Sequence, residues 1–295
     1  MTFSVIVPTY NRLSQLKKTL TSLFGQSFTD YEIIVVNDGG TDETHEYLTQ
    51  LASQGKLVYY KQVNSGPAIA RNLGLKNANG DYIAFTDDDC IVPKDWLKKY
   101  HEYFQNNSAA GLGGASRTGD ESNLFAVTND VIVNFLKNAI NTAQGSQITF
   151  LTTNNTVYKK SSLEKVGGFD KCFRIGAEER DLNYRLHMAG EVLQFDGSIV
   201  VDHYNDANFS KFLHHQFDQG KGSYIFYRNA LSRFGERPAL ISIKIYLQLL
   251  VYPFKTLRFI KALAVCILIV LAQAAVFVGY FAASFSKEIK GWGIR

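Results

Sequence analysis

Cysteine is scarce in this chain, and the few cysteines present are poorly placed for cross-links. Only three occur among 295 residues, Cys90, Cys172 and Cys266. They are far apart and form no CxxC pair, so the sequence argues against both a disulfide framework and a structural zinc site. This favours a reducing compartment, and we expect the folded domain of the chain to be cytoplasmic.

Concentrated positive charge is also missing. The net charge of +4 is spread along the chain, and no basic run is interleaved with aromatic residues, which disfavours nucleic acid as a partner. No basic stretch precedes the first apolar run at Phe3, so we expect no signal peptide. Repeats and low-complexity tracts are absent, and the hydrophobic content of 46% suits one α/β domain with an appendage.

One long apolar run is present, and it extends without a charge from Ala262 to Phe285. It is long enough to cross a hydrocarbon core of about 30 Å. A buried helix of a soluble core is the alternative. Lysine and arginine flank the run on both sides, so the positive-inside rule leaves its topology open.

The apolar stretch before this run contains Lys244 and Gln248, which suits a helix lying in the membrane interface. We therefore expect a cell-membrane protein with a single-pass or interfacial anchor. The predicted division of the chain is a catalytic domain (1–235), a basic interfacial segment (236–261), a transmembrane helix (262–285) and a basic tail (286–295).

The first part of the chain alternates between short apolar strands and segments with helical spacing of leucines. Four such strand-helix repeats predict a mostly parallel, Rossmann-like α/β sheet flanked by helices. Asn11 is the expected N-cap of the first helix. The expected strands are 3–8, 31–36, 57–61 and 82–85, and the expected helices are 13–24, 41–51, 66–75 and 94–104.

The pattern of the second part is less regular. A helix is expected at 209–234, with a break at Gly220-Lys221-Gly222. Another begins at Glu178, where acidic residues in the first turn complement the helix dipole. The remaining expectations are a helix within 121–141, strands within 148–158, and a strand at 200–204 that includes His203.

Three consecutive aspartates, Asp87, Asp88 and Asp89, follow the buried strand Tyr82–Phe85. Such a cluster repels itself, and a divalent cation with oxygen ligands, Mg²⁺ or Mn²⁺, would neutralise it. The alternative is a solvated acidic turn before the next helix. In parallel sheets, ligands bind beyond the carboxyl ends of the strands. We therefore expect Thr9, Tyr10, Asp38 and Asp87–Asp89 to line one crevice.

Six segments, taken in order, resemble the motifs of the inverting nucleotide-sugar glycosyltransferases of family 2, which have the GT-A fold. The resemblance covers roughly Thr2 to Tyr204. Each motif is weak alone, but their order and spacing are specific. The segments are Ser4–Arg12, Val36–Asp42, Ala70–Asn72, Asp87–Asp89, Val166–Asp170 and Glu178–Leu182.

The resemblance implies roles on the donor side. Tyr10 would stack on the nucleotide base, and Asp38 would accept a hydrogen bond from it. Asp89 would ligate the metal of a DxD motif, and His203 would contact that metal or the diphosphate. Pro8, Thr9, Arg12, Arg71, Asp87 and Asp88 would complete the nucleotide-sugar site.

On the acceptor side the resemblance implies roles for Gly168, Phe169, Asp170 and Glu178. The family usually has Glu-Asp where this chain has Glu178-Glu179, and the aspartate is the catalytic base. Glu179 therefore takes the base position with one extra methylene, and the choice between the two glutamates stays open.

The implied activity is transfer of a sugar from a nucleoside diphosphate, with a UDP-sugar favoured, to a hydroxyl of a glycan or lipid-linked acceptor. This activity belongs to polysaccharide biosynthesis. One alternative is a nucleotidyltransferase, although no glycine-rich loop with a lysine follows the first strand. The other is a membrane-anchored, non-catalytic module that binds nucleotide-sugars.

Overall fold

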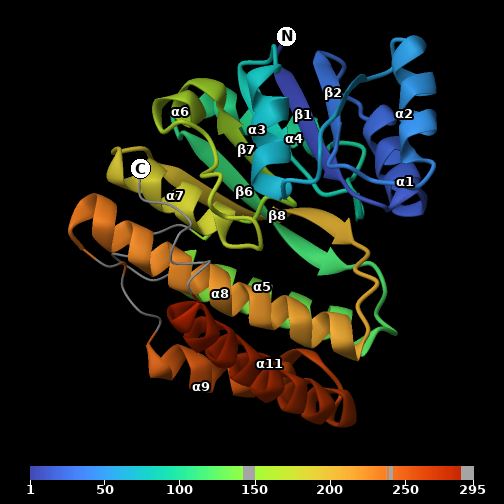
Figure 1. Ribbon diagram of the computed structural model, residues 1–295. Coiled ribbons are helices and arrows are strands. Elements are labelled where there is room, and N and C mark those ends of the chain that lie inside the picture. Colours follow the sequence, from blue (N-terminus) through green and yellow to red (C-terminus); the bar gives the residue numbers. More distant parts are fainter. Residues whose placement is uncertain (142–149, 237, 239–241, 287–295) are drawn as a thin grey trace.

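The computed structural model describes residues 1–141, 150–236, 238 and 242–286 (Figure 1). Its N-terminal part consists of four parallel strands, each followed by a helix, as the sequence predicts. The strands are β1 (Phe3–Thr9), β2 (Tyr31–Asn37), β3 (Val58–Lys61) and β4 (Tyr82–Phe85). The helices are α1 (Leu13–Phe24), α2 (Thr44–Ser53), α3 (Pro67–Lys76) and α4 (Trp96–Asn106).

The sheet has eight strands in the order β3-β2-β1-β4-β7-β6-β8-β5. The pairs of β1, β2, β3 and β4 with one another are parallel, whereas β7 is antiparallel to both β4 and β6. The sheet is therefore mixed, and the parallel half carries the expected crevice. The additional strands are β5 (Cys90–Ile91), β6 (Gly111–Thr118), β7 (Thr156–Lys159) and β8 (Leu193–His203).

A two-residue pairing places His203 next to the aspartates. Strand β5 pairs with the end of β8 in antiparallel register, with Cys90 opposite His203. The backbone N–H of Tyr204 also donates to the Asp89 carbonyl over 2.8 Å. This contact joins the turn after β4 to a strand more than a hundred residues later.

Asn11 does not cap α1, contrary to the expectation from sequence. Its φ of 53° is left-handed, the residue before the helix is Arg12, and no side-chain cap is formed. The Asn11 side chain instead accepts a hydrogen bond from the Thr41 N–H at 2.7 Å. It thereby ties the turn after β1 to the turn after β2, because a short amide reaches backbone donors of a neighbouring loop as readily as those of its own helix.

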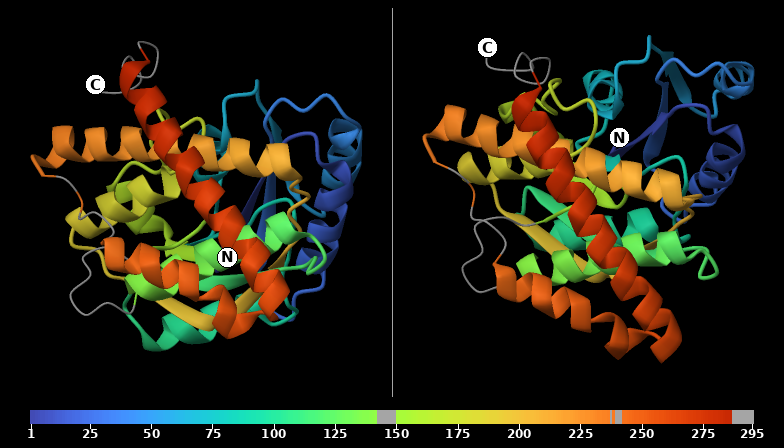
Figure 2. Two further views of the ribbon diagram at one scale, coloured as in Figure 1. Left: turned by 90° about the horizontal axis from the view of Figure 1, so that it is seen from below. Right: turned by 60° about the horizontal axis from the view of Figure 1, so that its bottom comes forward.

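The helices of the second half are α5 (Leu124–Asn141), α6 (Lys160–Lys165), α7 (Glu178–Met188), α8 (Phe209–Phe234), α9 (Ile243–Val251), α10 (Pro253–Thr256) and α11 (Phe259–Phe285). Of these, α5, α8, α9 and α11 lie below the sheet (Figures 1 and 2).

Two predicted segments lie partly outside the described residues. Of the predicted strand region 148–158, residues 148 and 149 are not described, and the part just before β7 is a turn rather than a strand. Of the predicted tail 286–295, only Ser286 belongs to the described residues.

Helix α8 is continuous, so the predicted break at Gly220 and Gly222 is wrong. Both glycines serve close packing instead. A Cβ on Gly220 would lie 2.0 Å from the Val276 carbonyl oxygen of α11, and one on Gly279 would lie 2.0 Å from the Phe217 carbonyl oxygen of α8. The two helices therefore cross with their backbones in contact (Figure 2). Glycine is retained because a side chain would separate them.

Helix α11 is long and apolar enough to cross a membrane by length and composition. A third of its most apolar stretch is buried inside the protein. Val265, Leu268, Ile269 and Ala272 pack into one core cluster with residues of α5, α8 and α9. The helix thus packs along the rest of the protein over much of its length.

Candidate active site

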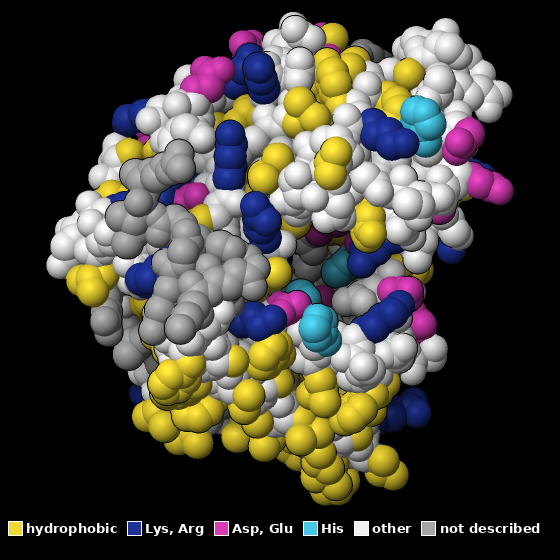
Figure 3. All heavy atoms as spheres, viewed as in Figure 1, with side chains coloured by type: hydrophobic (Ala, Val, Ile, Leu, Met, Phe, Trp, Pro, Cys, Tyr) yellow, Lys and Arg dark blue, Asp and Glu magenta, His cyan; other side chains and the backbone are white. Residues whose placement is uncertain are grey.

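A cavity of about 1650 Å³ opens below the carboxyl ends of β1, β2 and β4. Figure 3 shows it as a hollow in the middle of the molecule, with acidic and histidine side chains inside. Helices α5, α7, α8, α9 and α11 contribute its other walls. Among the predicted donor-side residues, it is lined by Pro8, Thr9, Tyr10, Arg12, Asp38, Arg71 and Asp87–Asp89. The expected convergence on one crevice is therefore what the fold produces.

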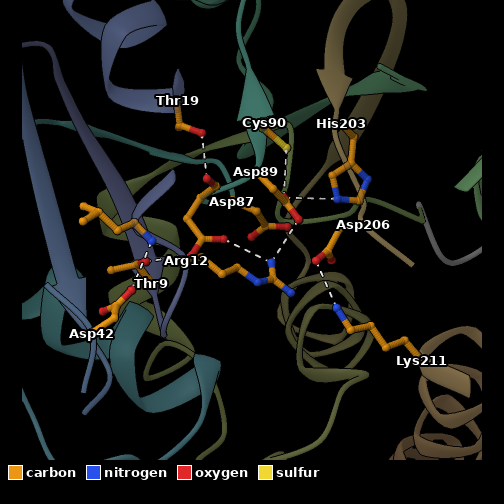
Figure 4. Close-up of polar contacts among 12 residues, drawn as sticks. Thr9, Arg12, Thr19, Asp42, Asp87, Asp89, Cys90, His203, Asp206 and Lys211 are labelled. Atoms are coloured by element: carbon orange, nitrogen blue, oxygen red, sulfur yellow. Dashed lines mark hydrogen bonds and ion pairs between the residues drawn. The ribbon is translucent and has the colours of Figure 1, made fainter. Parts of the chain in front are cut away.

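Each of the first two aspartates is held by a separate partner. Asp87 Oδ1 accepts from Arg71 Nη2 at 2.9 Å, and Asp88 Oδ2 accepts from Thr9 Oγ1 at 2.7 Å. The Asp88 carbonyl accepts from Thr19 Oγ1 at 2.9 Å, which fixes the turn to α1 (Figure 4). Burial raises the pKa of Asp88 to about 6, although the Arg12 guanidinium opposes that shift.

Asp89 and His203 face each other across the turn. His203 Nε2 lies 3.2 Å from Asp89 Oδ1, and Arg12 Nη1 lies 2.9 Å from Asp89 Oδ2 (Figure 4). Burial would raise the pKa of Asp89, but its interactions with His203 and Arg12 outweigh burial, and the pKa is lowered. The carboxylate is therefore ionised.

Candidate metal ligands converge at the same point. The ligand atoms of Asp89, Cys90 and His203 lie within 4.8 Å of one another. A carboxylate oxygen and an imidazole nitrogen suit Mn²⁺, and the oxygen suits Mg²⁺. Burial raises the pKa of the Cys90 thiol well above its usual value, so the thiol stays protonated and is a poor ligand. The donor set that fits a hard divalent ion is thus Asp89 with His203.

Arg71 connects this turn to helix α7. Its Nη1 donates to Glu178 Oε1 at 2.6 Å while its Nη2 contacts Asp87. The side chains of Arg71 and Glu178 are only 5% and 6% exposed. Within the described residues, Glu178 Oε2 is buried without a hydrogen-bond partner. Glu178 lines the cavity, so this oxygen remains available to a bound hydroxyl.

Glu179 lines the cavity beside Glu178. Burial, followed by the charge of Glu178, raises the pKa of Glu179 well above its usual range. Unlike Glu178, Glu179 makes no ion pair within the described part of the chain. Two arginines pair instead with neighbouring carboxylates, Arg71 with Glu178 and Arg185 with Asp181. A partly buried carboxyl with a raised pKa and no ion-pair partner among the described residues is typical of a general base.

Asp38 has a structural role in addition to its place in the cavity lining. Its carboxylate accepts from the backbone N–H groups of Ser65 and Gly66, both at 2.8 Å, and from Gln62 Nε2 at 2.6 Å. These contacts shape the loop before α3, where Gly66 has a φ of 92°. A carboxylate has about four acceptor sites, so one remains for a ligand.

Gly168, Phe169 and Asp170 do not line the cavity. Phe169 is bound through its backbone to the Asn72 side chain, by hydrogen bonds of 2.8 and 2.7 Å. Its ring lies 5.7 Å from the Arg71 guanidinium, and Asp170 pairs with Arg233 of α8. These residues therefore support Arg71 and α8 from behind.

Sequence reasoning missed part of the cavity lining. Asp130 of α5 and His215 of α8 line it, and burial raises the pKa of Asp130 to about 6. No motif marks either residue. Side chains of α9 and α11 also form one wall of the cavity. The sequence could not predict this, because an apolar run has the same pattern in a helix that lines a cavity and in a membrane helix.

Comparisons with known proteins agree with this geometry. Residues 4–167 match the family model "Glycosyl transferase family 2". An uncharacterized glycosyltransferase of Rickettsia felis is 40% identical over 106 residues, which are 36% of this chain and 17% of the relative. Glycosyltransferase GlyA of Streptococcus pneumoniae is 28% identical over 204 residues, 64% of this chain and 28% of the relative. The chain thus spans well under half the length of either.

Two solved structures share the fold. The Pyrobaculum calidifontis mannosyltransferase PcManGT, in complex with GDP-Man and Mn²⁺, is 19% identical with a TM-score of 0.61, covering 98% of this chain and 82% of that one. Staphylococcus aureus TarS 1-349, in complex with UDP-GlcNAc, is 18% identical with a TM-score of 0.58, covering 100% and 93%.

The mixed sheet and the cavity at its carboxyl ends define a GT-A fold. The family match extends over more than half of the chain. The chain therefore belongs to glycosyl transferase family 2.

Proposed function

We propose that this glycosyltransferase is metal-dependent and inverting, and that it moves a sugar from a nucleoside diphosphate to a hydroxyl of a glycan or lipid-linked acceptor. One observation carries the proposal. One cavity joins the aspartates after β4 to α7, and it is lined by an ionised Asp89 on one side and by a partly buried Glu179 with a raised pKa on the other. The donor can therefore bind near Asp89 while the acceptor hydroxyl lies near Glu179.

The donor would lie along the carboxyl ends of β1, β2 and β4. Tyr10 is 47% exposed at the cavity edge, so its ring is free to stack on a base. Asp38 would accept from that base, and Arg12 and Arg71 bring positive charge near the diphosphate. Relatives of the fold in complex with GDP-Man and UDP-GlcNAc support a nucleotide-sugar donor and leave the choice of nucleotide to experiment.

Asp89 and His203 would hold the divalent ion, with Asp87 and Asp88 on the ribose side. The Mn²⁺ in the mannosyltransferase complex supports a divalent ion as cofactor. When bound there, Mg²⁺ or Mn²⁺ would supply Lewis-acid stabilisation for the negative charge of the departing diphosphate. The residues of this chain then have to orient the sugar and accept one proton.

Glu179 is the proposed base. The acceptor oxygen forms a bond to the anomeric carbon while the bond from that carbon to the phosphate oxygen breaks, and the bonding electrons leave with the diphosphate. The hydroxyl proton passes to Glu179. One displacement from the opposite face inverts the anomeric centre, and it needs one base. Glu178, fixed by Arg71, would orient the acceptor through its unpartnered oxygen.

The stereochemistry of the product tests this proposal. Proton NMR of the first product formed from an α-linked donor is expected to show a β-glycosidic signal. The same signal should be lost with Glu179→Gln and kept, at a reduced rate, with Glu178→Gln. Retention of the α-configuration would overturn the single-displacement mechanism.

A further inference from the structure

The side chains of helix α11 have three different environments. On the side that faces the rest of the protein, Val265, Ile269 and Ala272 are buried. Further along that side, residues that include Gln273, Val276 and Tyr280 line the cavity. The opposite side is exposed and apolar, with Ile260 84%, Ile267 56%, Val278 57% and Phe285 79% exposed.

The packing of α11 on the rest of the protein argues against a helix that crosses the bilayer. Near one end of α11, Lys261 Nζ donates to the Glu121 carbonyl at 2.8 Å, and near the other end Gly279 lies against the α8 backbone. Beside that crossing, Asp218 and Lys221 of α8 form an ion pair of 2.9 Å. If α11 spanned, this charged helix and the cavity loops would enter hydrocarbon, where charges and irregular backbone are costly.

The exposed face does not end with α11. Helices α9 and α10 continue it, with Ile243 79%, Leu247 60%, Val251 55% and Phe254 43% exposed. Figure 3 shows hydrophobic side chains gathered over the lower part of the molecule, where Figure 1 places α9 and α11. Apolar surface on this scale marks an interaction site rather than ordinary solvent-facing surface.

The charges on this surface indicate its partner. Residues 242–286 contain Lys244, Lys255, Arg258 and Lys261 and neither aspartate nor glutamate. Lys244, Lys255 and Arg258 are exposed beside the apolar side chains. Apolar side chains bordered by cations alone complement an anionic lipid surface.

The same helices connect this surface to the cavity. Leu247 and Leu250 of α9 and Val270, Phe277 and Phe281 of α11 line the cavity that also contains Glu178 and Glu179. Four of these α9 and α11 side chains are also exposed: Leu247, Val270, Phe277 and Phe281. An apolar path thus leads from the outer surface to the carboxylates.

The geometry points to α9, α10 and α11 as a surface that docks on an anionic bilayer, with α11 parallel to the membrane plane. The wall of the cavity formed by α9 and α11 is then the entry for an acceptor with an apolar chain. This deepens the proposed function and rests on it for the role of Glu179. The acceptor class is an alcohol or sugar hydroxyl carried on a lipid chain.

Docking is tested by sedimentation of the full-length protein with vesicles. Binding is expected with vesicles containing phosphatidylglycerol and weaker binding with pure phosphatidylcholine. Replacing Lys244, Lys255 and Arg258 with glutamine should weaken binding by about fivefold for each charge removed. The matched control replaces the exposed Lys56, Lys76 and Lys98 and should leave binding unchanged. Equal losses in both triple variants, or no binding by the wild type, would overturn the docking surface.

Orientation is tested by the depth of single tryptophans at Ile260, Leu271 and Phe285, introduced one at a time into a Trp292→Phe background. The buried Trp96 adds a constant signal. Quenching by lipids brominated at shallow or deep positions should give one common, shallow depth for all three. A spanning helix would place Leu271 about 16 Å deeper than Ile260 at 1.5 Å per residue, and that result, or absence of quenching, would overturn the in-plane arrangement.

The acceptor class is tested with methyl and octyl glycosides below micellar concentration, using the donor that the protein accepts. The kcat/KM for transfer should rise with chain length, by at most about fourfold for each methylene that is buried against the α9–α11 wall. Val270→Asp should abolish this rise and Leu263→Asp, on the exposed face, should not. Release of nucleoside diphosphate without acceptor reports the proposed function separately. If release occurs while transfer is independent of chain length, the entry proposal fails alone, and if no donor is used at all, the proposed function fails.

Discussion

Arg71 donates to Glu178 Oε1 over 2.6 Å, and the two residues are 107 positions apart in the chain. The same guanidinium holds Asp87 at 2.9 Å. A single buried cation therefore fixes the turn after β4 relative to the first turn of α7. The candidate donor and acceptor sides of the cavity are positioned by one residue.

Arg71→Ala is expected to destabilise the protein by about 3–5 kcal/mol, because it leaves the buried Glu178 carboxylate without its countercharge. Urea unfolding followed by circular dichroism measures this loss. Adding Glu178→Gln to Arg71→Ala should recover part of it, since the uncompensated charge is then removed. If the double variant is as unstable as the sum of the two single variants, the pair is not coupled.

Glu179→Gln is expected to lower kcat by about 10²–10⁴-fold, the usual contribution of a general base. Donor affinity should be unchanged. The folded state raises the pKa of Glu179, so ionisation of this residue costs stability above the pKa of an unfolded glutamate. The glutamine variant should therefore melt at the same or a higher temperature at neutral pH. A clear drop in melting temperature together with lost activity would assign Glu179 a structural role instead.

The pH dependence of kcat/KM follows from the same carboxyl group. A base acts when deprotonated, so activity should rise with pH through an ascending limb well above the pKa of about 4.3 of a free glutamate. Activity is lost as the pH falls below that limb. Glu178→Gln removes the neighbouring charge that contributes to the shift, so it should move the limb to lower pH. If the ascending limb stays at the same pH in Glu178→Gln, the charge of Glu178 does not contribute to the raised pKa of Glu179.

Gly279→Ala is expected to destabilise the packing of α11 on α8, because the added Cβ would lie 2.0 Å from a backbone oxygen. Overpacking of this kind costs about 1–3 kcal/mol or more. Gly197→Ala is the matched control, since its Cβ would meet its nearest atom at an ordinary 3.5 Å. Limited proteolysis should cut within α9–α11 faster in the first variant alone. Equal cleavage of both would show that the α8–α11 contact is weak.

Local patterns were sufficient to predict several elements with their bounds. Helix α1, strand β4 and helix α8 begin and end at the predicted residues. The leucine spacing of α1, the short apolar run of β4 and the amphipathic pattern of α8 are each encoded within the segment itself. The family motifs likewise identified the residues at the ends of β1, β2 and β4, because strand ends in a parallel sheet meet at one edge.

Contacts between distant segments could not be predicted in the same way. The pairing of Cys90 with His203 involves two residues of β5, too few to produce a pattern. Gly220 and Gly222 resembled a helix break because glycine disfavours helix, but the close approach of α11 and of Gly176 outweighs that preference. The apolar run in α11 predicts burial without indicating whether protein or lipid surrounds it.

The most direct measurement of the central claim is release of nucleoside diphosphate from a panel of UDP-, GDP- and dTDP-sugars, with and without Mn²⁺ or Mg²⁺. We expect release from one donor that requires the metal and is lost in Asp89→Ala and in His203→Ala. Asp202→Asn is the control, because Asp202 neighbours His203 in β8 but pairs with Arg117. Release that continues without metal, or that survives both substitutions, would contradict the account.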